Sequence, residues 1–94
     1  MKKAIVIIQN EEGLHARPAS VFSNAAMKFK CDILMLKNMD ESKVYNPKSI
    51  LSVLSMGAKK GDELTIIADG TDEEEAIDKI NEIISNGLVE GDQK

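Results

Sequence analysis

The stretch GLHARPAS, residues 13–20, holds the one histidine and the one arginine of the chain, two positions apart. Pro18 follows directly, and helix-forming residues continue from there, so we predict that a helix begins just after His15. The N-terminus of a helix exposes unpaired backbone N–H groups and the positive end of the helix dipole. The imidazole of His15 would therefore stand at an electropositive point of the backbone.

Two chemical consequences follow for this imidazole. A neutral imidazole keeps a lone pair, with which one ring nitrogen can act as a nucleophile. A phosphoryl group placed on the ring would meet backbone N–H donors and the guanidinium of Arg17. Gly13 allows a tight turn into the helix, and Pro18 fixes the backbone of its first turn. The pattern favours a reversible phosphoryl acceptor at His15.

Spacing alone leaves other interpretations of His15 open, because a histidine near a helix start is commonly a cap or a surface residue. A metal site is disfavoured, since one histidine and the one cysteine, Cys31, cannot complete a ligand set. No Gly-rich phosphate loop and no acidic metal cluster lie close by. We therefore expect neither a cofactor nor nucleotide hydrolysis, and the phosphoryl group must come from one partner and leave to another.

Composition restricts the class of protein. The chain has 94 residues, of which 43% are hydrophobic and 3% aromatic, and this predicts one domain over residues 1–94 with an aliphatic core. The net charge of −4 argues against a broad nucleic-acid-binding surface. The start MKKAIVII is too short for a signal peptide, and no stretch is long enough to cross a membrane. Together with a single cysteine, these features lead us to expect a cytoplasmic protein without membrane insertion.

The hydrophobic pattern predicts the elements that position His15. Apolar β-branched runs indicate strands, and apolar residues at every third or fourth position indicate helices. Thr71 and Glu74 fit a capping box at the start of the last helix, and Gly87 ends it. The order βαββαβα predicts an α+β fold, an open-faced two-layer sandwich with a four-stranded antiparallel sheet covered on one face by helices. The predicted strands are 2–8, 31–37, 43–46 and 64–69, the helices 16–29, 48–57 and 71–87, and the flexible tail 88–94.

Three stretches of the chain together resemble HPr, the histidine-containing phosphocarrier family of the bacterial phosphoenolpyruvate:sugar phosphotransferase system. GLHARPAS is similar to the active-site signature of this family. NPKSILSVLSMGAKKGDELTI, residues 46–66, is similar to its second signature, a serine-headed short helix followed by a strand. ADGTDEEEAI, residues 68–77, is similar to its approach to the last helix. The resemblance covers nearly the whole chain.

The resemblance implies a function for the first site. His15 would accept a phosphoryl group on Nδ1 from phosphorylated enzyme I and pass it to the sugar-specific EIIA domains, while Arg17 neutralises the phosphate. The protein would be a carrier without turnover of its own, and a monomer. Two alternatives remain: a purely regulatory binding module of the same fold, whose known paralogue lacks the histidine, and a specialised carrier for nitrogen regulation or for one sugar.

Ser49 is the second site that the resemblance implies. In many relatives the matching serine is phosphorylated by HPr kinase/phosphorylase, and the modified protein acts as a corepressor with a catabolite control protein. Ser49 precedes a predicted short helix, where added negative charge is favoured. Without the resemblance, an ordinary N-cap serine is the preferred interpretation.

The short helix after Ser49 carries more apolar residues than one buried face needs. We expect some of them to stay exposed near His15 as a docking patch, as in the family, the alternative being that all are core. The residues expected to contact partners are Ala16, Ser20, Ile50, Leu51 and Leu54. Three lysines would either add positive charge for an acidic partner or be solvated without function; they are Lys28, Lys48 and Lys59.

A few positions depart from the family pattern. The turn over residues 38–46 is longer than in familiar members. Pro47 stands where the family usually has an apolar residue such as leucine, and Ser52 stands where it often has glycine. Glu12 brings a negative charge close to His15, which disfavours a phosphoryl group there.

Overall fold

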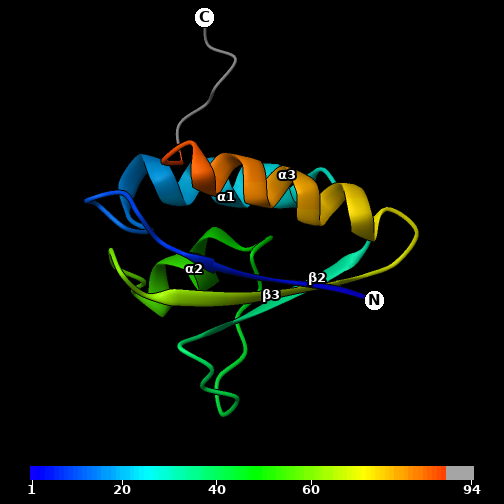
Figure 1. Cartoon of the computed structure of the whole chain (residues 1–94), viewed down its shortest axis with the longest axis horizontal. Helices are drawn as coiled ribbons and strands as arrows, with labels where there is room; N and C mark the ends of the chain where they lie inside the picture. Colours follow the sequence, from blue (N-terminus) through cyan, green and yellow to red (C-terminus); the bar gives the residue numbers. More distant parts are fainter. Residues whose placement is uncertain (89–94) are drawn as a thin grey trace, which may run out of the picture.

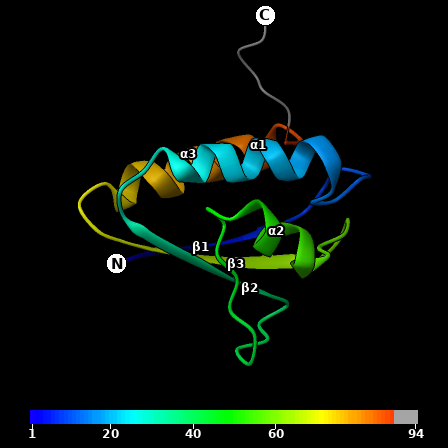
Figure 2. The ribbon, with the colours of Figure 1, turned by 180° about the vertical axis from the view of Figure 1, so that it is seen from behind.

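Two layers make up the fold: α1 and α3 lie side by side over one face of an antiparallel sheet, and α2 packs against α1 (Figures 1 and 2). The structure, a computed structural model, describes residues 1–88. The predicted α+β sandwich with helices on one face of the sheet is confirmed. The elements in chain order are β1 (Lys2–Ile7), α1 (Ala16–Met27), β2 (Asp32–Lys37), α2 (Ile50–Met56), β3 (Glu63–Asp69) and α3 (Glu73–Ser85).

The core lies between the sheet and the helices. The strand order is β1-β3-β2, so β3 is central and pairs with both neighbours. Alternate β3 residues turn toward the helices, and Leu64, Ile66 and Ala68 are fully buried there. Phe22 of α1 and Ile80 of α3 are also fully buried. Phe22 is the one aromatic residue among the buried hydrophobic residues of the described chain, as the low aromatic content predicts.

The predicted third strand forms only a single bridge. Tyr45 exchanges two backbone hydrogen bonds of 2.9 Å with Met35 of β2, and the ladder stops there. The next N–H along, that of Asn46, donates to the hydroxyl of Ser52 at 2.9 Å, and Pro47 has no N–H to donate. The sheet of the described residues therefore has three strands where four were expected, with Tyr45 at its β2 edge.

The start of α3 is built differently from the prediction. Its N-cap residue is Asp72, whose side chain does not bond the helix, so the capping box of Thr71 and Glu74 is wrong. The carboxylate of Glu73 accepts a hydrogen bond of 3.0 Å from the N–H of Gly70, in the turn before the helix. The Asp72 side chain instead binds the backbone of another loop.

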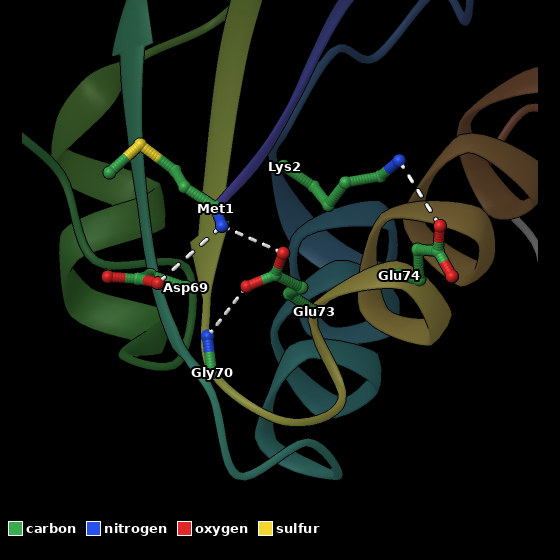
Figure 3. Close-up of polar contacts among 6 residues, drawn as sticks. All are labelled: Met1, Lys2, Asp69, Gly70, Glu73 and Glu74. Atoms are coloured by element: carbon green, nitrogen blue, oxygen red, sulfur yellow. Dashed lines mark hydrogen bonds and ion pairs between the residues drawn. The ribbon is translucent and has the colours of Figure 1, made fainter.

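Ion pairs join the beginning of β1 to α3, as Figure 3 shows. The α-amino group of Met1 lies 2.8 Å from Glu73 Oε2 and 3.7 Å from Asp69 Oδ1. The Nζ of Lys2 lies 3.3 Å from Glu74 Oε2. The hydrogen bond to Glu73 raises the pKa of the α-amino group above its ordinary value. Apart from the half-buried Glu73, these groups are largely exposed, so each pair contributes little to stability.

The C-terminal end of α3 follows the prediction at Gly87. This residue adopts φ 77°, and its N–H donates to Ile84 O at 3.1 Å, while the N–H of Leu88 donates to Ile83 O at 2.8 Å. These two bonds form a Schellman cap. Leu88, expected as the first tail residue, is only 1% exposed, and residues 89–94 of the predicted tail lie outside the described residues. Within residues 1–88 no helix is long and apolar enough to span a membrane.

Candidate functional site

His15 is the N-cap residue of α1 and has an exposed side chain. Its backbone is extended, with φ −129° and ψ 160°. The N–H groups of Ala16 and Arg17 have no partner inside the helix, because the first turn of any helix lacks preceding carbonyls. The first bond back to the cap runs from the N–H of Ala19 to His15 O, at 3.5 Å. The imidazole thus stands at the helix N-terminus, as predicted.

Ala16, next to the imidazole, has a strained backbone. Its φ is 54°, in the left-handed region, although it is not glycine, and this costs about 1–2 kcal/mol. Such a conformation persists only where the surroundings fix the chain. Leu14 and Pro18 are buried on either side of Ala16, so the packing of both neighbours holds the strained residue in place.

The loop before His15 is fixed against the loop that follows α2. Leu14 is completely buried, and its N–H donates to Ala58 O at 3.0 Å. Gly13 has φ 64°, and a Cβ there would lie 2.4 Å from the same carbonyl oxygen. Asn10 Nδ2 donates to Gly13 O at 2.9 Å. Gly13 therefore supplies the predicted turn and also a close backbone approach that the sequence did not indicate.

The guanidinium of Arg17 is available to an anion. Its side chain is exposed, and within residues 1–88 no carboxylate lies within ion-pair distance of it. The one charged pair in the loop before His15 joins Glu11 to Lys60, at 2.8 Å, and it lowers the pKa of the Glu11 carboxyl through the hydrogen bond to Lys60. The Arg17 guanidinium is thus not engaged in an ion pair within residues 1–88.

Ser49 is the N-cap residue of α2. Its Oγ accepts a hydrogen bond of 3.2 Å from the N–H of Ser52, and its carbonyl accepts one of 3.0 Å from Val53. The side chain is half-buried. The N-cap geometry expected for an ordinary serine is therefore present.

The apolar residues of α2 divide between core and surface. Val53 and Met56 are buried, whereas Leu51 is 75% exposed, Leu54 39% and Ile50 37%. The alternative that all three predicted contact residues are core is wrong. Ile50 shares with Ser20 of α1 the lining of a cavity of about 220 Å³. The fold therefore brings two residues of the predicted docking patch together, Ser20 from α1 and Ile50 from α2.

Of the three lysines expected at a partner surface, Lys48 is already engaged. Its Nζ donates to Phe29 O and to Cys31 O, both at 2.7 Å. Lys28 and Lys59 are exposed. The carbonyls that hold Lys48 lie 19 and 17 residues away along the chain, so no local pattern could have revealed them.

Comparisons with known proteins identify the family of the chain. A family model described as "PTS HPr component phosphorylation site" matches residues 2–86. The chain is 45% identical over 90 residues to phosphocarrier protein HPr of Mycoplasma pneumoniae, covering 95% of this chain and 99% of that protein. The solved structure of HPr-C-His from Thermoanaerobacter tengcongensis superposes with a TM-score of 0.88 at 38% identity, covering 96% of this chain and 98% of the other.

A third relative is the multiphosphoryl transfer protein of Haemophilus influenzae, which is 35% identical over 89 residues. The match covers 94% of this chain and 18% of that larger protein. The fold and these matches define a phosphocarrier domain. The chain belongs to the HPr family, the phosphocarriers of the phosphotransferase system.

Proposed function

We propose that the protein relays a phosphoryl group from phosphorylated enzyme I to the sugar-specific EIIA domains through Nδ1 of His15, in the cytoplasm. The observation that supports this most is the exposed His15 side chain at the N-terminus of α1, with the exposed Arg17 two residues on. An imidazole placed this way is accessible to a macromolecular donor and acceptor in turn.

The transfer step forms one bond and breaks another. The lone pair on Nδ1 attacks the phosphorus atom, and the bond from phosphorus to its donor atom on enzyme I breaks, with the electron pair staying on enzyme I. The N–H groups of the first turn and the Arg17 guanidinium offset the charge of the phosphoryl oxygens. In the second step a nucleophilic atom of the EIIA domain attacks the phosphorus atom, and the bond from phosphorus to Nδ1 breaks, with its electron pair returning to Nδ1.

The direct test is incubation of the purified chain with enzyme I and phosphoenolpyruvate. We expect an acid-labile phosphoryl adduct that disappears when an EIIA domain is added. A chain that gains no adduct would contradict the relay.

Arg17→Glu is expected to slow transfer from enzyme I about 100-fold or more, because it removes a charged donor to the phosphoryl group and adds repulsion. The side chain is exposed, so the circular dichroism spectrum should stay that of the wild type. Arg17→Lys keeps the charge but not the planar guanidinium, so its transfer rate should fall between those of the wild type and Arg17→Glu. Loss of the folded signal in Arg17→Glu would show that Arg17 is structural and would contradict this role.

We also propose that Ser49 is phosphorylated by HPr kinase/phosphorylase, which would make the protein a corepressor for a catabolite control protein. Support comes from the position of Ser49 as N-cap of α2, since negative charge is favoured at a helix N-terminus. Added phosphate would change partner docking more than the fold, because Leu51 and Leu54 of the same helix are exposed.

Ser49→Ala should abolish the acid-stable adduct formed with the kinase and ATP, as measured by mass spectrometry. Ser52→Ala, three residues along α2, should keep the adduct and serves as the matched control. Loss of the cap bond to Ser52 should cost Ser49→Ala about 1 kcal/mol, which does not unfold the domain. An unchanged adduct in Ser49→Ala would remove the regulatory role.

The docking surface that we propose for these partners combines the two helices beside His15. It contains exposed residues of both helices. Ser20 and Ile50 line one cavity, and Leu51 is the most exposed of its α2 residues. One face serves all partners in turn, which favours a monomer; a dimer mass in sedimentation equilibrium would contradict this. The residues are Ala16, Ser20, Ile50, Leu51 and Leu54.

A further inference from the structure

We propose that Lys48 is a positioning residue for phosphoryl transfer. Together with Asp72 it clamps the α1–β2 loop (residues 28–31), and this clamp fixes the segment that carries Ser49 and Ile50 against α1. The kinetic part of the inference rests on the proposed function.

The cationic side of the clamp is the Lys48 ammonium. Its two hydrogen bonds of 2.7 Å end on carbonyls of the α1–β2 loop, at Phe29 and Cys31. The side chain is half-buried, and hydrogen bonds from a charged donor are the stronger kind. Lys48 therefore ties the beginning of α2 to the end of α1.

The anionic side is the carboxylate of Asp72, the N-cap residue of α3. Its Oδ2 accepts from the N–H of Lys30 at 2.8 Å, and its Oδ1 accepts from the N–H of Cys31 at 2.9 Å. The bond from the Lys30 backbone is the main reason that the pKa of Asp72 lies below its usual range. Cys31 is thus bonded through its N–H to an anion and through its carbonyl to a cation.

This arrangement makes the clamp one electrostatic unit. The peptide group between Phe29 and Lys30 donates its N–H to Asp72, and its carbonyl accepts from Lys48. These two bonds polarise that peptide group in the same direction, so each strengthens the other. Losing either Asp72 or Lys48 should therefore weaken the hold of the remaining one. A solvated lysine, or one reserved for a partner, would show no such dependence on Asp72.

The clamp connects to the docking patch through the backbone of residues 46–49. The N–H of Lys48 donates to Asn46 Oδ1 at 2.9 Å, and the N–H of Ser49 donates to Asn46 O at 3.0 Å. Lys48 and Ile50 also line the 220 Å³ cavity whose other wall is α1. Release of Lys48 would therefore shift Ser49 and Ile50 relative to α1.

The test compares Lys48→Met, Lys48→Arg, Asp72→Asn and the double variant Lys48→Met/Asp72→Asn in transfer from enzyme I. It is run at a temperature where circular dichroism shows every variant folded; Lys48→Gln replaces Lys48→Met if that variant does not fold. Lys79→Met, on the exposed surface of α3, is the control for lost charge. We expect Lys48→Met and Asp72→Asn each to raise KM for the carrier about 5- to 10-fold with kcat within about twofold.

The clamp further predicts that KM of the double variant is no higher than about twice the KM of the poorer single variant, since the two residues act as a unit. Lys48→Arg should restore the wild-type KM, and Lys79→Met should not change it. A wild-type KM in Asp72→Asn would overturn the inference, because Lys48 would then act directly on the partner or not at all. The inference would be overturned equally if the two single-variant effects on KM combined in full in the double variant.

Failure of the clamp can be distinguished from failure of the phosphoryl relay. If the wild-type chain accepts no phosphoryl group, the relay is wrong, and the clamp is still tested by NMR. Asp72→Asn should then shift the amide resonances of Ser49 and Ile50 while those of Gly13 and His15 stay in place. Unshifted Ser49 and Ile50 resonances would overturn the clamp alone.

Discussion

His15→Ala is expected to abolish the acid-labile phosphoryl adduct formed with enzyme I and phosphoenolpyruvate, lowering its yield at least about 1,000-fold. The chain contains no other histidine, so no second imidazole can take over the nucleophilic role. Quantitative phosphate labelling followed by acid treatment measures the yield. An adduct of wild-type size in His15→Ala would place the acceptor elsewhere and would contradict the relay.

The same variant should leave the fold intact, which makes the loss of the adduct interpretable. The His15 side chain is exposed and makes no cap hydrogen bond, so its truncation should change the free energy of unfolding by no more than about 0.5 kcal/mol. Urea unfolding followed by circular dichroism measures this value. His15→Gln, which keeps a planar polar side chain without a nucleophilic nitrogen, should behave like His15→Ala in both assays.

Gly13→Ala should have the largest effect on stability of any single methyl addition near the site. The new Cβ would lie 2.4 Å from Ala58 O and 2.8 Å from Lys59 Cα, and both are backbone atoms that cannot turn away. Overpacking adds to the cost of φ 64° for alanine, so we expect a loss of about 3 kcal/mol. Transfer should slow as well, because the loop must separate from Ala58 and carry His15 with it.

Gly57→Ala is the matched control for Gly13→Ala. Gly57 has nearly the same φ, 63°, but no atom lies within 4 Å of the place where its Cβ would be. It should therefore cost only about 1 kcal/mol, the backbone term alone. Equal losses of unfolding free energy in the two variants would show that the contact with Ala58 is unimportant to the site.

The parts of the site that sequence could predict are those fixed by neighbours along the chain. Pro18 and the helical pattern after it placed the start of α1, and so placed His15 at an N-cap. Gly57 and Gly87 marked helix ends because a left-handed residue is needed there. In each case the cause of the structure lies within a few residues of its effect.

The parts that sequence could not predict depend on distant partners. Asp72 binds peptide groups 41 and 42 residues away, so a local capping box was the wrong interpretation of its surroundings. The predicted third strand stops at Tyr45 because Ser52 captures the next N–H. The strain at Ala16 arises from packing on both of its sides, and no residue type signals it.

The central claim is that the His15 ring itself carries the phosphoryl group. The most direct measurement is NMR of the ¹⁵N-labelled chain after incubation with enzyme I and phosphoenolpyruvate. The relay predicts a phosphorus–nitrogen coupling at Nδ1 of His15, and its disappearance when an EIIA domain is added. Phosphorus bonded to any other atom of the chain, or an imidazole spectrum unchanged by the incubation, would contradict it.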